Sequence, residues 1–200
     1  MQTAGIIIEY NPMHDGHLYL LEQVRAQLGA DTAFVGVMSG NFVQRGVPAM
    51  MDKRVRVRAA LSGGADLVVE LPLPFATASA ETFAYGALSL MQAAGCVDMV
   101  SFGAEDGQEK LQKVLAVLLS ERFEPVFRLR LAEGGSYAAA RAQTVAELAG
   151  EETAAVLTRP NNILGIEYLK AAHRLHFYPQ WEAIPRRGVG HDQPGEEKGL

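Results

Sequence analysis

Short apolar runs alternate along this chain with longer stretches in which apolar residues recur at helical spacing. Four runs are apolar, rich in β-branched residues and bounded by turn residues, which is typical of strands buried in a parallel sheet: residues 5–8, 32–38, 65–71 and 96–102. Helical patterns begin near Asp15, Ser79 and Gln108. This alternation predicts an α/β fold with a parallel sheet and crossover helices.

The pattern becomes mainly helical after residue 108. Gly134 and Gly135 mark a joint, a helix is expected over 137–149, and an amphipathic helix is expected over 163–175. We therefore expect a sheet domain over residues 1–135 and a helical extension over 136–192. The last residues, 193–200, are polar and charged and are expected to form a disordered tail.

The first predicted strand runs into a turn that carries two histidines. An Asn-Pro pair punctuates the turn, Asp15 or an adjacent residue caps the next helix, and Gly16 lets a ligand approach the backbone. The N–H groups that begin such a helix form an anion site. His14 and His17 are three residues apart, so both imidazoles can stabilise negative charge developing on one phosphorus. Two ordinary surface histidines are the alternative, but the strand, turn, glycine and amphipathic helix together favour the site.

A long polar and glycine-rich connection follows the second predicted strand, which indicates a functional loop at the sheet edge. Asp52 can cap the next helix. Four basic residues crowd the first two turns of that helix: Lys53, Arg54, Arg56 and Arg58. Two interpretations stay open. The cluster is a solvated face, or loop and helix recognise phosphate through Asn41, Gln44, Arg45 and Lys53.

Other polar residues near predicted strand and helix ends have two interpretations each. Glu70 is either a solvent-facing strand end or a carboxylate of the site. Gly103 can let the backbone approach an adenine or a ribose, whereas Glu105 and Asp106 can instead cap the helix near residue 108. Asn161, at the start of the predicted helix over 163–175, can act as a plain cap.

Composition narrows the class of protein. A chain of 200 residues with 48% apolar residues suffices for one α/β domain, and a net charge of −5 gives no overall signature of nucleic-acid binding. The single cysteine, Cys96, excludes an internal disulfide or a multi-cysteine zinc site, and we expect it to be a buried small hydrophobe. The apolar start has no basic leader and is interrupted by Glu9, and no run can span a membrane. A cytoplasmic protein with no membrane partner and no protein-held metal is expected.

The segment H-D-G-H after the first strand resembles the H-x-G-H signature of the nucleotidylyltransferase superfamily. The longer segments GIIIEYNPMHDGHLYL, VMSGNFVQRGVPAMMDKRVR, DLVVELP, SFGAED and RPNNILGIEYLKA are similar, in this order, to the tRNA(Met) cytidine acetate ligase family. The resemblance implies a Rossmann-like nucleotide-binding domain of the nucleotidylyltransferase type, with the helical extension completing an ATP site. It also implies activation of acetate by ATP as acetyl-adenylate, and acetyl transfer to the wobble cytidine of elongator methionine tRNA.

With this resemblance, we expect His14, His17 and Lys53 to be catalytic, with Mg²⁺ sharing the charge of the phosphates. ATP contacts are expected along an unbroken run from the first strand into the first helix: Ile7, Ile8, Glu9, Tyr10, Asn11, Pro12, Met13, His14, Asp15, Gly16, His17, Leu18, Tyr19 and Leu20. Further contacts are expected at Asn41, Gln44, Gly103, Asn161 and Arg186, with Arg187 as the alternative to Arg186.

Members of this family continue into a further helical region with a second nucleotide motif that contains serine and arginine. This chain has no such motif, so we expect a truncated product whose catalysis and tRNA docking are incomplete. Two alternatives follow. The chain is another H-x-G-H nucleotidylyltransferase, or it is a truncated, non-catalytic nucleotide-binding module.

Overall fold

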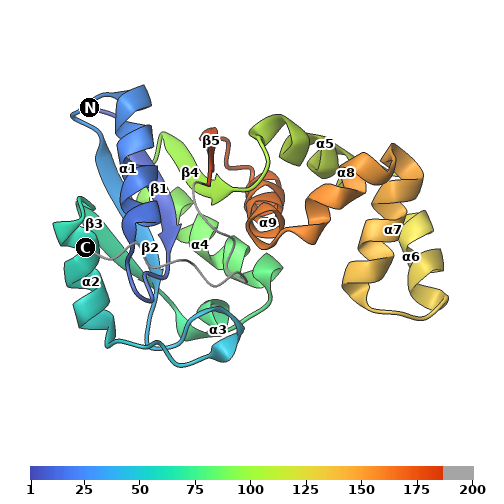
Figure 1. Ribbon diagram of the computed structural model, residues 1–200, viewed down its shortest axis with the longest axis horizontal. Coiled ribbons are helices and arrows are strands. Elements are labelled where there is room, and N and C mark those ends of the chain that lie inside the picture. The colour runs from blue at the N-terminus through green and yellow to red at the C-terminus, as the bar shows by residue number, and fades with distance from the viewer. Residues whose placement is uncertain (187–200) are drawn as a thin grey trace, which may run out of the picture.

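A parallel sheet with helices on both faces forms the body of the protein (Figure 1). The computed structural model describes residues 1–186, apart from the side chain of Arg45. The sheet has the order β3-β2-β1-β4-β5, and all its pairings are parallel. The strands are β1 Thr3–Ile8, β2 Ala33–Ser39, β3 Leu67–Leu71, β4 Met99–Ala104 and β5 Gln180–Pro185. The predicted α/β fold with a parallel sheet is confirmed.

Side chains alternate between the two faces of the sheet and so build two apolar cores. Ile6 and Ile8 of β1 point to one core, together with Leu21 and Val24 of the first helix. Val37 and Val100 belong to the other core, which is covered mainly by α4 and α9. The helices are α1 Asp15–Leu28, α2 Lys53–Ser62, α3 Leu73–Ala76, α4 Ala80–Ala94, α5 Gln108–Leu118, α6 Phe123–Ala132, α7 Tyr137–Ala149, α8 Glu151–Ala155 and α9 Pro160–Leu175, with 3-10 turns η1 Gln44–Gly46 and η2 Val156–Thr158.

The strand order reverses beside β1. The chain proceeds from β1 to β2 and β3 on one side, and then returns to place β4 and β5 on the other side. Open α/β sheets bind ligands in the crevice outside the carboxyl ends of the strands at such a switch point. The segments that leave β1 and β4, which carry the histidines and Glu105, therefore meet at one edge.

The strand β5 was not predicted from the sequence. Its six residues read QWEAIP, and polar Gln180 and Glu182 interrupt the apolar pattern expected of a buried strand. Among residues 1–186 it forms a sheet edge and pairs with β4 alone, and it buries Ala183 and Ile184. The segment 136–192 is therefore not purely helical, because α9 and β5 return to the sheet. Its division from residues 1–135 stays a prediction, and residues 193–200 lie outside the described part.

The expectation that Cys96 is a buried small hydrophobe is wrong. The side chain is exposed, because β4 begins at Met99 and Cys96 lies in the preceding connection. Gly95 ends α4 in the left-handed conformation, with φ of 68°, so the chain changes direction there before the strand starts. Within residues 1–186, every helix is too short or too polar to cross a membrane.

Helices α6 and α7 lie at the end of the molecule away from β2 and β3 (Figure 1). A buried ion pair ties α7 to α9, since Nη1 of Arg141 lies 2.7 Å from Oε1 of Glu167 and both side chains are at least nine-tenths buried. Each residue keeps one buried polar atom that has no hydrogen-bond partner among the described residues, Nη2 of Arg141 and Oε2 of Glu167. The pair therefore joins the outer helices to the sheet through charge and not through apolar packing alone.

We expect Arg141→Met to lower the free energy of unfolding by about 3–5 kcal/mol, because it leaves the buried Glu167 carboxylate with only the more distant Lys170, whose Nζ lies 3.6 Å from Oε2. Urea denaturation would measure this loss. The exposed pair Arg128 and Glu124 on α6 is the matched control, and Arg128→Met should cost less than about 1 kcal/mol. The double variant with Glu167→Leu should recover part of the loss. Equal effects of Arg141→Met and Arg128→Met would contradict the prediction.

Candidate functional site

The turn after β1 is held in place at two adjacent residues, Tyr10 and Asn11. Tyr10 has a left-handed φ of 45°, and its side chain is buried in the core. This burial raises the pKa of the Tyr10 hydroxyl to about 12. Asn11 precedes Pro12 through a cis peptide, and its Oδ1 accepts a 2.7 Å hydrogen bond from the N–H of Met50. The loop before α2 is therefore bonded directly to the turn that leads to the histidines.

The two histidines stack on each other at the start of α1. Their ring centroids are 3.7 Å apart with an interplanar angle of 25°, and the Tyr10 ring lies 4.6 Å from that of His17. His14 is the N-cap, so the predicted cap falls on the residue adjacent to Asp15. Nδ1 of His14 accepts from the N–H of Gly16 at 3.1 Å, and the N–H of His14 donates to Nδ1 of His17 at 3.2 Å. The two rings therefore lie together, and their action on one phosphorus stays a prediction.

These hydrogen bonds select the tautomer of both rings. A ring nitrogen that accepts from a backbone N–H carries no proton, so each neutral imidazole of His14 and His17 carries its proton on Nε2. Gly16 leaves room for this arrangement. A Cβ at residue 16 would lie 3.0 Å from Cε1 and 3.1 Å from Nδ1 of His14, which is tighter than ordinary packing. The expected role of Gly16 in ligand approach stays a prediction.

The expected run of ATP contacts divides into a buried strand and a surface helix start. Its exposed residues are Pro12, His14, Asp15, Gly16 and Leu18. The others are buried or half-buried: Ile7, Ile8, Glu9, Tyr10, Asn11, Met13, His17, Tyr19 and Leu20. Ligand contact by the buried strand residues would therefore have to use their backbone at the carboxyl end of β1.

The loop between β2 and α2 lies against the end of β1. The N–H of Gln44 donates to Oε1 of Glu9 at 2.6 Å, and Asn41 is exposed. Asp52 caps α2 as predicted, since its Oδ1 accepts from the N–H of Arg54 at 2.8 Å. Lys53 makes an ion pair with Glu70, with Nζ 2.7 Å from Oε2. Glu70 is thus an exposed strand-end residue that neutralises the lysine predicted to be catalytic.

The basic cluster on α2 is not a uniform face. Arg54 and Arg58 are exposed, as a solvated face predicts, but Arg56 is completely buried. Neither interpretation of the sequence predicted this burial. An alternating pattern of valine and arginine in KRVRVRAALS gives no sign of which arginine points inward.

Three predicted contacts that are far apart in the sequence come together at the end of β4. Nη1 of Arg186 donates to Oδ1 of Asn161 at 3.2 Å, and the N–H of Arg186 donates to the carbonyl of Ala104 at 3.0 Å. A Cβ at Gly103 would lie 3.5 Å from Cγ of Arg186. The strand β5, which was not predicted from the sequence, positions Arg186 beside Asn161. Arg187 lies outside the described residues, and the nucleotide roles of all these residues stay predictions.

Glu105 caps α9 and not α5, so the alternative role suggested by the sequence is wrong. Its Oε2 accepts from the N–H of Asn162 at 2.9 Å, and its Oε1 accepts from Nδ2 of Asn161 at 2.6 Å. The cap of α5 is Gly107, which has no side chain to offer. The carboxylate of Glu105 therefore orients the amide of Asn161 that also contacts Arg186.

Asn162 is a site residue that sequence reasoning missed. It is completely buried, and its Oδ1 accepts 3.0 Å hydrogen bonds from the N–H groups of Glu105 and Asp106. Its Nδ2 donates to Oδ2 of Asp106 at 2.8 Å and to the carbonyl of Val156 at 3.2 Å. The second Asn of the Asn-Asn pair was the available signal, but a sequence cannot show which of the two points inward.

Asp106 is held in its charged form by this network. Desolvation by burial alone would raise the pKa of its carboxyl, but hydrogen bonds from Asn162 and Lys110, with the charges of Arg159 and Lys110, outweigh it and lower the pKa. The carboxylate is therefore matched to donors from α5, from α9 and from Arg159, the residue that precedes α9.

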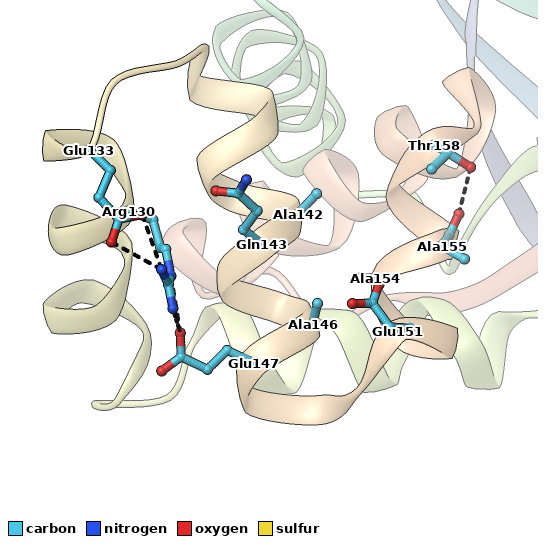
Figure 2. Close-up of a pocket in the computed structure, with 10 residues that line it drawn as sticks. All are labelled: Arg130, Glu133, Ala142, Gln143, Ala146, Glu147, Glu151, Ala154, Ala155 and Thr158. Carbon is cyan, nitrogen blue, oxygen red and sulfur yellow. Dashed lines mark hydrogen bonds and ion pairs between the residues drawn. The ribbon is translucent and has the colours of Figure 1, made fainter.

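A cavity of about 620 Å³ lies away from these residues, between α6, α7 and the α8–η2 segment (Figure 2). Arg130 at its rim pairs with Glu133 and Glu147, as Figure 2 shows. None of the predicted site residues lines it. Among the described residues, no group of three His, Cys, Asp or Glu side chains is placed to hold a metal ion.

A parallel sheet with a histidine pair and a helix start at its switch point defines a Rossmann-like nucleotide-binding protein. The sequence matches the family described as HIGH Nucleotidyl Transferase over residues 1–198, and the chain belongs to that family. The superfamily predicted from the H-x-G-H segment is thereby confirmed.

Similar proteins agree with the resemblance to the tRNA(Met) cytidine acetate ligase family. A protein of Syntrophotalea carbinolica named tRNA(Met) cytidine acetate ligase is 48% identical over 195 residues, covering 96% of this chain and 46% of the relative. A protein of the same name from Caldanaerobacter subterraneus subsp. tengcongensis is 45% identical over 193 residues, which cover 94% of this chain and 48% of the relative. The crystal structure of Thermotoga maritima TmcAL bound with alpha-thio ATP matches this chain with a TM-score of 0.88 at 38% identity. The match covers 94% of this chain and 47% of that protein. The chain spans about half the length of these relatives.

We expect Asp106→Asn to lose stability in a pH-dependent way. Because the pKa of Asp106 is lower in the folded protein than in the unfolded chain, its contribution is complete above the unfolded pKa and disappears as the pH falls through the folded pKa. The difference in free energy of unfolding between wild type and variant should be constant near neutral pH and shrink below about pH 4. Urea denaturation at several pH values measures it, with exposed Glu109→Gln as the control. A difference that does not change with pH would refute the prediction.

Proposed function

We propose that this chain binds ATP at the carboxyl edge between β1 and β4 and serves an ATP-dependent acetate–tRNA ligase. In this activity, acetate is activated as acetyl-adenylate and the acetyl group passes to the wobble cytidine of elongator methionine tRNA. The observation that carries this proposal is the stacked His14–His17 pair on the helix start after β1, in a chain 38% identical to a protein crystallised with alpha-thio ATP. Because the proposed partner is a tRNA, we place the protein in the cytoplasm.

The α-phosphate of ATP would lie at the start of α1, where the helix dipole and the N–H groups favour an anion. The Nε2–H groups of His14 and His17 would donate to its oxygens as an acetate oxygen attacks the phosphorus in line. Both histidines act by electrostatics and position, without forming covalent bonds. The cytidine amine would then attack the carbonyl carbon of the mixed anhydride and release AMP.

Pyrophosphate would leave toward Lys53. The lysine is already paired with Glu70, but this pair is exposed, with 38% and 51% of the two side chains accessible. Exposed pairs are worth at most about 1 kcal/mol, so a polyanion can replace the carboxylate as the partner of Lys53. A Mg²⁺ ion bound mainly by the phosphates would share their charge. The choice of acetate over another small carboxylate rests on the names of the relatives.

A non-catalytic ATP-binding module is the second candidate, because the chain spans about half the length of its relatives. We expect the isolated chain to bind ATP but to acetylate tRNA poorly, since its net charge of −5 attracts an RNA polyanion weakly. Calorimetry measures the affinity for ATP. Incubation with ATP, acetate and elongator methionine tRNA, followed by mass spectrometry for acetylcytidine, measures the acetylation.

Gly16→Val should abolish ATP binding in a folded domain, since the valine side chain displaces the His14 ring. Wild-type affinity in this variant would place the ATP site elsewhere, and robust acetylation would show that residues 1–200 suffice for the reaction.

Replacement of the histidine that corresponds to His17 by alanine in a full-length relative should lower the rate of adenylate formation by about 100- to 1000-fold, because one preorganised donor to developing charge is lost. ATP affinity should change much less. Single-turnover assays separate the two quantities. The matched control is the position of His173, which is exposed at the last turn of α9. An unchanged rate would leave His17 a structural residue.

A further inference from the structure

Arg56 is the largest completely buried side chain of the described residues. It lies in the second turn of α2, on the face turned toward the sheet, while its neighbours Arg54 and Arg58 are exposed. Burying a cation costs free energy unless its donors are satisfied. An apolar side chain could fill the same space at lower cost, so packing alone does not account for an arginine here.

The guanidinium bonds backbone carbonyls from three separate segments. Nη1 donates to the carbonyl of Glu9 at 2.6 Å, and Nε donates to that of Met51 at 3.3 Å. Nη2 donates to the carbonyl of Ser39 at 3.0 Å and to that of Gly40. None of these four acceptors is a carboxylate. A planar fork with five N–H donors suits this task, whereas a lysine ammonium has only three donors on one atom.

The bonded carbonyls lie where the two segments with candidate site residues leave the sheet. Glu9 follows β1 and leads into the turn of His14 and His17. Ser39 ends β2, and the loop after Gly40 carries Asn41 and Gln44. The side chain of Glu9 also connects the two segments. Its Oε1 accepts from the N–H of Gln44 at 2.6 Å and from the hydroxyl of Ser39 at 3.4 Å. The two segments are thus bridged by one cation and one anion.

The same bonds fix the direction of backbone donors. In a trans peptide, the N–H lies opposite the carbonyl. Because the carbonyls of Glu9, Ser39 and Gly40 face the guanidinium, the N–H groups of Tyr10, Gly40 and Asn41 face away from it. Arg56 therefore orients the peptide units at which both segments begin.

We propose that Arg56 is a positioning residue for the nucleotide site, which sets the spacing between the β1–α1 turn and the β2–α2 loop. The first part, the clamping of two segments, rests on the contacts above. The second part, its effect on ATP, rests on the proposed function. No contact between Arg56 and a ligand is involved, because the side chain is completely buried.

Hydrogen exchange and ATP titration of the 200-residue chain test the two parts separately. The variants are Arg56→Met, which keeps the volume without the donors, and Arg56→Lys, which keeps the charge without the fork. Arg58→Met on the exposed face of α2 is the matched control. We expect amides of residues 9–14 and 40–51 to exchange at least about tenfold faster in Arg56→Met, with α4 and α9 unchanged. The dissociation constant for ATP should rise at least about tenfold. Arg56→Lys should show smaller changes in the same direction, and it carries the test if Arg56→Met does not fold.

Wild-type exchange in both segments, or an equal increase in all elements, would overturn the clamping role. Faster exchange in the two segments with unchanged ATP affinity would overturn the positioning role. If the wild-type chain does not bind ATP, the proposed function fails for this chain, and the exchange data alone then decide whether Arg56 clamps the two segments.

Discussion

Backbone groups at the carboxyl edge of a parallel sheet need hydrogen-bond partners where the strands end, and the site depends on how this chain supplies them. Within a strand the ladder bonds each peptide, but the turns that follow have no ladder. Arg56 bonds the carbonyls of Glu9, Ser39 and Gly40, and Asn162 bonds the N–H groups beyond β4. A buried polar group left unpaired costs about 1–3 kcal/mol. The hydrogen bonds of Arg56 and Asn162 therefore stabilise the irregular turns by pairing their backbone groups.

The two sides of the edge differ in charge. Under the β1–α1 turn lies the guanidinium of Arg56, whose pKa is lowered by desolvation, while the charges of Glu9, Asp52 and Glu70 act in the opposite sense. An arginine stays charged under these conditions, so a permanent cation lies against the backbone of Glu9, where the turn that leads to α1 begins. Beyond β4, the carboxylates of Glu105 and Asp106 are compensated by the start of α9 and by basic side chains. This polarity suits phosphates near α1 and an uncharged group near β4.

Helix α9 connects the site to the rest of the protein. Its first turn carries Asn161 and Asn162, and its middle carries Glu167, which pairs with Arg141 of α7. After its end, β5 brings Arg186 back to the amide of Asn161. The burial of Tyr168, and secondarily the negative charge of Glu9, raise the pKa of the Tyr168 hydroxyl. A shift of α9 would move both the outer helices and the β4 side of the site.

The sequence by itself determined the α/β class, the first four strands, most helices and the histidine pair, because these depend on local periodicity and on short turn signals. Asp52 as the cap of α2 is another local feature, readable from residue type and position. The nucleotide contacts expected at Gly103 and at Asn161 came from resemblance, not from periodicity.

Only the tertiary structure decided the strand β5, the burial of Arg56 and Asn162, the exposure of Cys96 and the cap that Glu105 provides for α9. Apart from the exposure of Cys96, which follows from where β4 begins, each of these depends on a partner that is distant along the chain: β5 on β4, Arg56 on the ends of two strands, Glu105 on residues 161 and 162. Residue type states which hydrogen bonds a side chain can form, but the packing of the sheet decides which backbone groups lie within its reach.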